Sequence, residues 1–271
     1  MEYIIQAQKR VSLNLKELWQ YRELFYFFTW RDIKVKYKQA VLGSLWAILQ
    51  PFFTMLIFTF LGSMLKIPSD GIPYPIFAYS GLMFWTMFAS SVSSAGNSMV
   101  SNANIIKKIY FPRLIIPMSS ILVASFDFIM AFVVFIGLLF YFQMDVSVLR
   151  MLIFLPISFV MTIVTAFGMG SFLAALNVKY RDFRYVIPFL VQSLMFLTPV
   201  IYPISLLKYE WAKYLLALNP MSGVINLSRT VIVNKPLDLN LFFISLTSAI
   251  FMFFIGLYYF RKTEAYFADI A

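Results

Sequence analysis

Six long apolar stretches divide the chain, and they constrain its fold more than any other feature. A helix needs about 20 residues to cross the roughly 30 Å hydrocarbon core of a bilayer. The chain is 61% hydrophobic and 13% charged, whereas soluble domains average about 45–50% and about 25%. We therefore predict an all-α integral membrane protein with six transmembrane helices, at residues 41–65, 75–97, 114–142, 151–176, 185–201 and 239–260. The fifth is the shortest and contains Pro188 and Pro199.

The distribution of Lys and Arg predicts the orientation in the membrane. Sixteen of the 22 basic residues lie in the segments that fall on one side, and the other side receives the remaining six. Basic residues favour the cytoplasmic side of short loops. Both termini are therefore expected in the cytoplasm. The predicted organisation is a cytoplasmic amino-terminal segment at 1–40, one transmembrane domain at 41–260 and a cytoplasmic tail at 261–271.

Two segments outside the spans have helical character. Asn14 and Glu17 have the spacing of a capping box. Apolar residues then recur every three or four positions, which predicts an amphipathic helix at the cytoplasmic interface. These apolar residues are Leu18, Tyr21, Phe25 and Phe28.

Residues 204–237 are assigned to the outer side, yet they are rich in Leu, Val and Ile. Asn219-Pro220 divides the segment, and a proline favours a break there. We predict two short helices that form a re-entrant hairpin on the outer face, since helices satisfy their own backbone groups at membrane depth. A simple pair of surface helices is the alternative.

Most catalytic chemistry lacks the residues that it needs. The chain has no Cys and no His, which removes disulfides, Cys/His zinc sites and histidine bases. It also lacks the G-x-x-x-x-G-K-[ST] phosphate loop. We therefore expect no catalytic residue, metal or cofactor on this chain. Asp127 is the only acidic residue well inside a predicted span. It is either a functional intramembrane group or a partner in a buried hydrogen bond or ion pair.

Three cytoplasmic segments combine basic residues with apolar and aromatic ones, at 30–38, 104–112 and 177–184. Orientation by positive charge and contact with lipid headgroups would explain the basic residues. It does not explain the apolar and aromatic members, which are typical of docking residues. Since the basic residues are dispersed between apolar spans, nucleic acid is not expected as a partner.

These segments resemble the ABC-2 type permeases of bacterial polysaccharide exporters, which export O-antigen, capsule or wall teichoic acid chains. The resemblance covers essentially the whole chain and rests on the order and spacing of short motifs. The motifs are RDIKVKYKQ (31–39), LGSLW (42–46), QP (50–51), NIIKKIYFP (104–112), NVKYRD (177–182), PVIYP (199–203), NPM (219–221) and FRKTE (260–264).

The resemblance implies a transport subunit rather than an enzyme. Two copies of the chain would form a homodimer in the bacterial inner membrane, with two copies of an ATPase subunit that bind ATP and Mg²⁺. The substrate would be a lipid-linked, O-antigen-like polysaccharide. The residues that the resemblance assigns to ATPase coupling are Asn104, Ile105, Ile106, Lys107, Lys108, Ile109, Tyr110, Phe111 and Pro112, with Lys179, Tyr180, Arg181 and Asp182.

The chain is also rich in aromatic residues, with 31 Phe, 16 Tyr and 5 Trp. Aromatic faces can stack on sugar rings, and a sliding polymer needs many weak contacts of this kind. Lipid contact, core packing or an interfacial belt are the alternatives. The candidate channel aromatics are Phe52, Phe53, Phe58, Phe60, Phe189, Phe196 and Tyr202.

Three other functions compete with polysaccharide export. An ABC-2 exporter of a lipid or drug is the nearest, and an ion-coupled carrier would use Asp127. A membrane-embedded glycosyl or acyl transferase would need an acid/base pair or metal ligands, and the sequence suggests neither.

Overall fold

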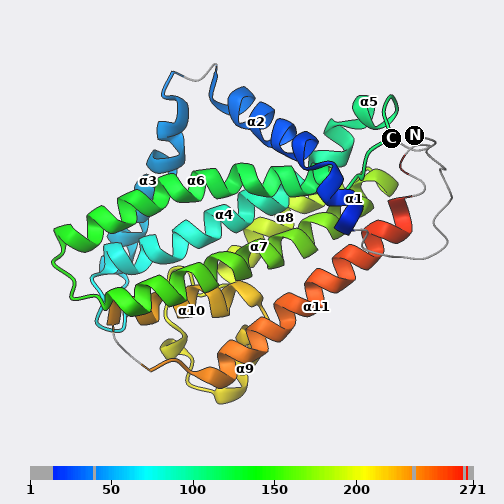
Figure 1. Cartoon of the computed structure of the whole chain (residues 1–271). Helices are drawn as coiled ribbons and strands as arrows, with labels where there is room; N and C mark the ends of the chain where they lie inside the picture. Colours follow the sequence, from blue (N-terminus) through cyan, green and yellow to red (C-terminus); the bar gives the residue numbers. More distant parts are fainter. Residues whose placement is uncertain (1–14, 39–40, 234–235, 265–266, 268–271) are drawn as a thin grey trace.

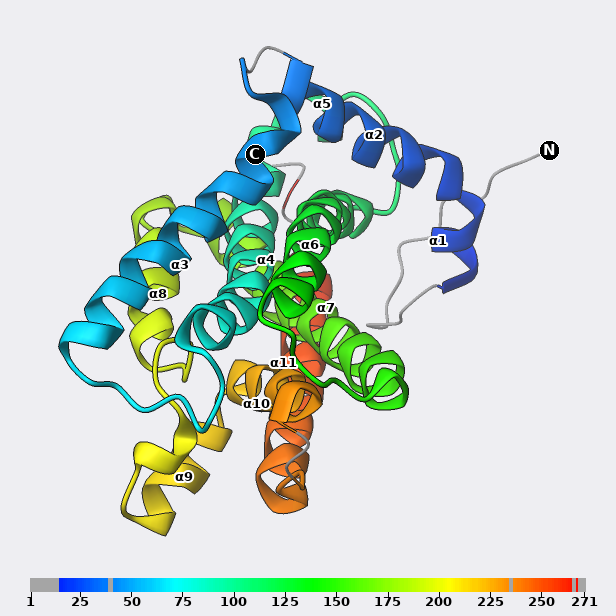
Figure 2. The same ribbon diagram turned by 90° about the vertical axis from the view of Figure 1, so that its left-hand side faces the viewer.

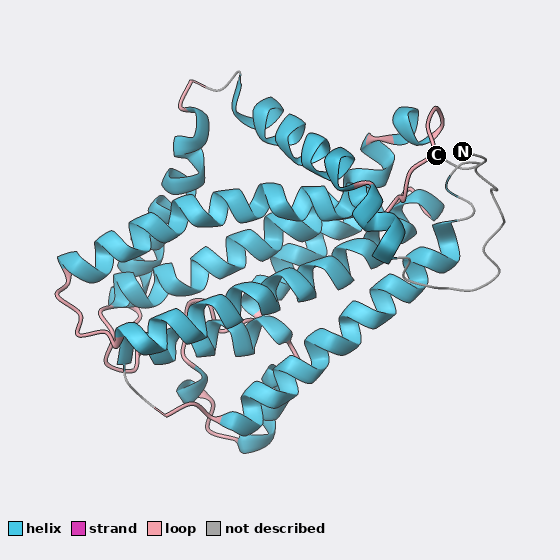
Figure 3. Cartoon of the chain, viewed as in Figure 1, coloured by secondary structure: helices cyan, strands magenta, loops and turns pink. Residues whose placement is uncertain are grey.

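The computed structural model describes residues 15–38, 41–233, 236–264 and 267, and none of these lies in a strand (Figure 3). Five of the described helical segments are long and apolar enough to cross a membrane. The all-α membrane class predicted from the sequence is thereby confirmed. The five are Gly43–Met64, which includes α3 (Trp46–Met64), and α4 (Tyr74–Ser101), α6 (Ile115–Tyr141), α7 (Val148–Lys179) and α11 (Leu239–Glu264).

The sixth predicted span, at 185–201, corresponds to a shorter helix. α8 (Phe183–Phe196) has 14 residues, or about 21 Å at about 1.5 Å per residue. Residues 197–202 are in turns and bends. A helix of this length does not reach across about 30 Å of hydrocarbon by itself. The described part of the chain therefore has five helices of membrane-crossing length rather than six.

The bundle has two ends that differ in their connections (Figure 1). We call the end that holds α5 (Ala103–Ile106) the near end, and the end that holds α9 (Glu210–Ala217) and α10 (Pro220–Val233) the far end. The described beginning and end of the chain both lie at the near end: Tyr110 Oη donates to Glu17 Oε1 at 3.1 Å, and the backbone N of Arg113 donates to Glu264 Oε1 at 3.3 Å.

α4 lies at the centre of the bundle, where it packs against α6, α7, α3 and α10. α7 and α11 cross at two glycines, Gly168 and Gly256. A Cβ added at either glycine would overlap the backbone of the opposite helix. Small residues of this kind allow helix backbones to approach closely, which is a common basis of association in membranes.

The amino-terminal segment forms α1 (Leu15–Gln20) and α2 (Arg22–Lys38), and α2 lies beside α6. The predicted apolar face is confirmed: Phe28 is buried in a core cluster at the near end, and the other predicted members pack against it. Asn14 of the predicted cap lies outside the described residues. The opposite face leaves large aromatic side chains exposed, namely Trp19, Tyr26, Phe27 and Trp30.

The two short helices predicted around Asn219-Pro220 are also present, as α9 and α10. Asn219 fixes the break between them, because its Nδ2 donates to Thr198 Oγ1 at 2.7 Å and its Oδ1 accepts from the Met221 backbone N at 3.1 Å. α10 is almost completely buried, whereas α9 exposes Trp211 and Leu215.

Candidate transport groove and docking surface

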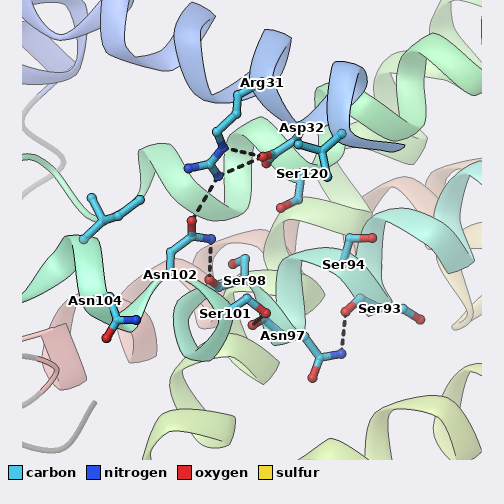
Figure 4. A pocket seen from close by; sticks show the side chains of 12 residues that line it. Arg31, Asp32, Ser93, Ser94, Asn97, Ser98, Ser101, Asn102, Asn104 and Ser120 are labelled. Carbon is cyan, nitrogen blue, oxygen red and sulfur yellow. Dashed lines mark hydrogen bonds and ion pairs between the residues drawn. The ribbon is translucent and has the colours of Figure 1, made fainter. Parts of the chain in front are cut away.

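A large cavity opens at the near end between α2, α4, α5 and α6 (Figure 4). Its volume is about 790 Å³. Ten of the twelve lining residues are polar or charged. The lining residues are Arg31, Asp32, Val35, Ser93, Ser94, Asn97, Ser98, Ser101, Asn102, Asn104, Ile105 and Ser120.

The two charges in this cavity neutralise each other. Arg31 and Asp32 form an ion pair at 2.8 Å. The Arg31 guanidinium also donates to Asn102 Oδ1 at 3.0 Å, and Asn102 Nδ2 donates to the Ser98 carbonyl at 2.9 Å. This chain of contacts links α2 to the end of α4 (Figure 4). The wall is therefore polar but carries no net charge.

A second cavity lies further along α4, towards the middle of the bundle. Its volume is about 440 Å³. α3 contributes Gln50 and Thr54, α4 contributes Thr86 and Ser90, and α8 contributes Met195. Ser93 of α4 lines both cavities. The two cavities therefore meet along one face of α4, and we call them together the groove.

Asp127 lies in the second cavity and is paired. Its carboxylate forms an ion pair with Lys36 and accepts a hydrogen bond from the Tyr37 hydroxyl. Burial, and then the hydrogen bond to Asp127, raise the pKa of Tyr37, so the phenol remains a donor at neutral pH. Of the two interpretations of Asp127 from the sequence, the structure shows the ion pair. The partners come from α2, about 90 residues earlier in the chain.

Sequence reasoning missed the polar face of α4. Its members, Thr86, Ser90, Ser93, Asn97 and Ser101, are three or four residues apart, which places them on one side of a helix. The periodicity is readable in the sequence, but it lies inside a span identified by hydropathy. α4 is the least hydropathic of the five long helices.

The predicted coupling segment, 104–112, divides into a buried part and an exposed part. Ile106 and Phe111 are buried within this chain, and the ring centroid of Phe111 lies 5.6 Å from that of Phe28 on α2. Pro112 is buried and Ile105 half-buried. The helix itself, α5, has only four residues. The exposed members are Asn104, Lys107, Lys108, Ile109 and Tyr110.

The second predicted contact, the loop at 179–182, is exposed at the same end. Lys179 lies over the Tyr180 ring at 5.1 Å, and Arg181 and Asp182 are exposed. Asn177 anchors this loop to α4, because its Nδ2 donates to the Gly96 carbonyl and to Asn97 Oδ1, both at 3.0 Å. Exposed basic and aromatic side chains on an anchored loop suit a protein-docking surface.

The predicted channel aromatics lie on α3, on α8 and just after α8, two helices that both border the second cavity and lie on one side of the bundle (Figure 2). Phe53 and Phe60 on α3 and Phe189 and Phe196 on α8 are exposed. The three others are half-buried: Phe52 and Phe58 pack against the core, and the Tyr202 hydroxyl donates to the Phe196 carbonyl at 3.2 Å.

Arg229 on α10 is another feature that the sequence analysis did not identify. It falls in the segment assigned to the outer side, yet its side chain is buried at the far end. Its guanidinium lies 3.5 Å from the Phe77 ring centroid and donates to three backbone carbonyls. These belong to Pro199 at 2.6 Å, Val200 at 2.6 Å and Phe77 at 3.0 Å. Arg229 thus joins α10, the turn after α8 and the first residues of α4.

The structure is thus a bundle of apolar helices with a polar groove, whose charged side chains are paired, and with exposed basic loops at one end. The chain belongs to the ABC-2 type transporter family, which matches residues 23–233. The resemblance inferred from the short motifs is confirmed, and the chain is a multi-pass membrane protein.

Relatives match the chain over three quarters of its length or more. The chain is 30% identical over 266 residues to the O-antigen export system permease protein RfbA of Klebsiella pneumoniae, covering 96% of this chain and all of that protein. It is 30% identical over 210 residues to the protein of the same name from Myxococcus xanthus, covering 76% and 79%. The polysialic acid transport protein KpsM of Escherichia coli is 24% identical over 242 residues, covering 86% and 91%.

Proposed function

We propose that this chain is the membrane permease of an ATP-driven exporter that moves a lipid-linked polysaccharide across the bacterial inner membrane. The observation that carries the proposal is the end-to-end similarity to permeases named for O-antigen export. The groove supports it, because its uncharged hydroxyl and amide groups suit a sugar polymer better than an apolar drug or a free ion.

The energy source would be a separate ATPase that docks at the near end. Lys107, Lys108, Ile109 and Tyr110 are exposed there, as is the loop at 179–182. Apolar and aromatic side chains exposed beside cations are typical of a protein contact. The segment 103–113 connects α4 to α6, so movement of a docked ATPase would reach two of the helices that line the groove.

The near end would face the cytoplasm, since the charge bias of the loops favours that orientation. α8 with residues 197–203 would form the sixth span, and α9 and α10 would form the re-entrant hairpin at the outer face. The burial of α10 supports the hairpin, because a buried helix with paired backbone groups is tolerated at membrane depth.

A long glycan needs a continuous passage, and two copies of the chain related by a two-fold axis would enclose one. α3 and α8 would face each other across this homodimer. Their exposed Phe53, Phe60, Phe189 and Phe196 support the idea, since a large exposed aromatic surface marks an interface with protein or lipid.

Deletion of the gene in its host bacterium tests the proposal. We expect the surface polysaccharide to disappear and its lipid-linked precursor to accumulate inside the cell, and we expect the wild-type gene to restore display. Normal display of the polysaccharide in the deletion strain would overturn the proposed function.

A further inference from the structure

We propose that the polar face of α4 is a binding track for the uncharged sugar units of the glycan. We call Thr86, Ser90, Ser93, Asn97 and Ser101 the α4 track. The nature of the polymer rests on the proposed function, whereas the position of the track rests on the two cavities that it lines.

The charges around the groove favour a neutral ligand. Each cavity has one cation and one anion in its described wall, and in each case the two are paired: Arg31 with Asp32 at 2.8 Å, and Lys36 with Asp127. A site for a phosphate or carboxylate would need a net positive wall. A paired wall instead offers hydrogen-bond donors and acceptors without attracting either sign of charge.

The hydroxyl groups of the track are available to a ligand. Those of Ser90 and Ser93 are half-buried and form no hydrogen bond within the described residues. Those of Thr86 and Ser101 donate to carbonyls of their own helix, at 3.1 Å and 3.0 Å, and keep lone pairs that can accept. Because a sugar hydroxyl both donates and accepts, it can bind at each of these positions.

The dimensions of the track suit a polymer rather than a single ring. Thr86 and Ser101 are 15 positions apart in one helix, which corresponds to about 22 Å. The polar groups repeat at each turn, so a sliding chain would exchange similar hydrogen bonds. In the second cavity, the nearly buried Trp85 and Phe128 also line the wall, so a small apolar surface lies beside the polar groups.

Photocrosslinking to the native glycan tests the track directly, since the chain has no natural cysteine. Five variants each carry one cysteine, in place of Ser93, Asn97, Phe53, Phe189 or Phe140. The cysteine is labelled with a benzophenone maleimide in host cells, in the assembled exporter. Phe140 on α6 is 79% exposed and is the outer control. We expect periodate-stained glycan on the chain after illumination at Ser93 and Asn97, and none at Phe140.

Crosslinks at Phe53 and Phe189 without crosslinks at Ser93 and Asn97 would overturn the track and leave the exporter function in place. The same holds if no position crosslinks while the labelled cells still display the polysaccharide. Failure of the function itself would show separately, as normal display in the deletion strain.

Substitutions provide a second readout. S90L/S93L should lower export by about tenfold or more, because it removes two hydroxyls whose hydrogen bonds are each worth up to about tenfold in affinity. S63L and T247L remove exposed hydroxyls outside the groove and should export normally. S90A/S93A removes the same two hydroxyls without adding volume, so a loss of export in both double variants is not caused by the bulk of leucine. Normal export by S90L/S93L would contradict the track.

The neutrality of the wall has its own test. Asp32→Asn leaves Arg31 unpaired and should reduce export, and R31Q/D32N removes both charges and should recover much of it. Stronger crosslinking of the glycan in the Asp32→Asn protein would show an anionic ligand and overturn the proposal.

Discussion

α3 and α4 are neighbours in the bundle, and they reverse the usual relation between hydrophobicity and burial. In α4, 78% of the most apolar 18-residue stretch is buried, compared with 17% in α3. Yet α4 is the less hydropathic of the two. α3 exposes Phe53, Ile57 and Phe60, whereas α4 directs hydroxyl and amide groups into the groove.

The difference shows which helices of a membrane protein lie inside the bundle and which lie at its surface. In water, apolar side chains gain by burial, but lipid is as apolar as the protein core. A helix with polar groups must therefore lie inside the bundle, where those groups meet partners or a cavity. Polar residues within a span therefore indicate a helix that lies inside the bundle.

The largest expected effect is on docking of the ATPase and concerns Lys107 and Lys108, in the segment that follows α4. K107E/K108E should abolish co-purification of the partner ATPase, because reversal of a charge in a buried interfacial pair costs about 2–5 kcal/mol. Both lysines are exposed, so folding should not change. K66E/K208E makes the same change at the far end and should leave the complex intact. Equal recovery of the ATPase from both double variants would exclude Lys107 and Lys108 from docking.

The far end of α4 gives the next largest effect. Arg229→Leu leaves the carbonyls of Pro199, Val200 and Phe77 without their donor. We expect a loss of about 3 kcal/mol in the free energy of unfolding, since hydrogen bonds to charged groups contribute about 1.5–3 kcal/mol. Titration with SDS measures it. Arg229→Lys should recover only part, because an ammonium lacks the planar fork of guanidinium. Wild-type stability for Arg229→Leu would refute the three-carbonyl contact.

A pair of matched substitutions sharpens the contrast in burial. Phe84 on α4 is fully buried, and its ring centroid lies 5.0 Å from that of Phe128, whereas Phe53 on α3 is 54% exposed. Phe84→Ala should cost about 2 kcal/mol or more through the cavity that it leaves. Phe53→Ala should cost well under half of that in the same SDS titration. Equal losses would contradict the difference in burial between these two side chains.

The smallest effect concerns the contact between α2 and the groove. Asp127→Asn removes the ion pair with Lys36 and should lower stability by about 1 kcal/mol, because the pair is partly exposed to solvent. Hydrogen exchange in α2 should become faster. Asp145→Asn changes an exposed carboxylate at the far end and serves as the control. Unchanged exchange in α2 after Asp127→Asn would show that other contacts hold the helix.

Much of the fold could be predicted from the sequence, because apolar run length and loop charge act locally. The five long helices, the apolar face around Phe28 and the two short helices around Asn219-Pro220 all follow from such patterns. α8 is shorter than its apolar stretch, since turns begin at Leu197. Hydropathy records the apolar residues there and not the backbone break.

The groove could not be predicted in the same way, because its walls come from distant parts of the chain. Lys36 and Asp127 are 91 positions apart, and Arg31 and Asn102 are 71 positions apart. Neither pair has a local signature. The α4 track does have one, in the spacing of Ser90, Ser93 and Asn97. Mean hydropathy identifies the span, but it averages over the segment and does not record this spacing.

Transport by purified components tests the central claim most directly. The chain and its partner ATPase are reconstituted in proteoliposomes that contain the lipid-linked glycan of the host, and a membrane-impermeant glycosidase is enclosed in the lumen. We expect the glycan to become sensitive to the glycosidase only when ATP and Mg²⁺ are added outside. Glycan that stays fully protected, although the complex is assembled and hydrolyses ATP, would contradict the account.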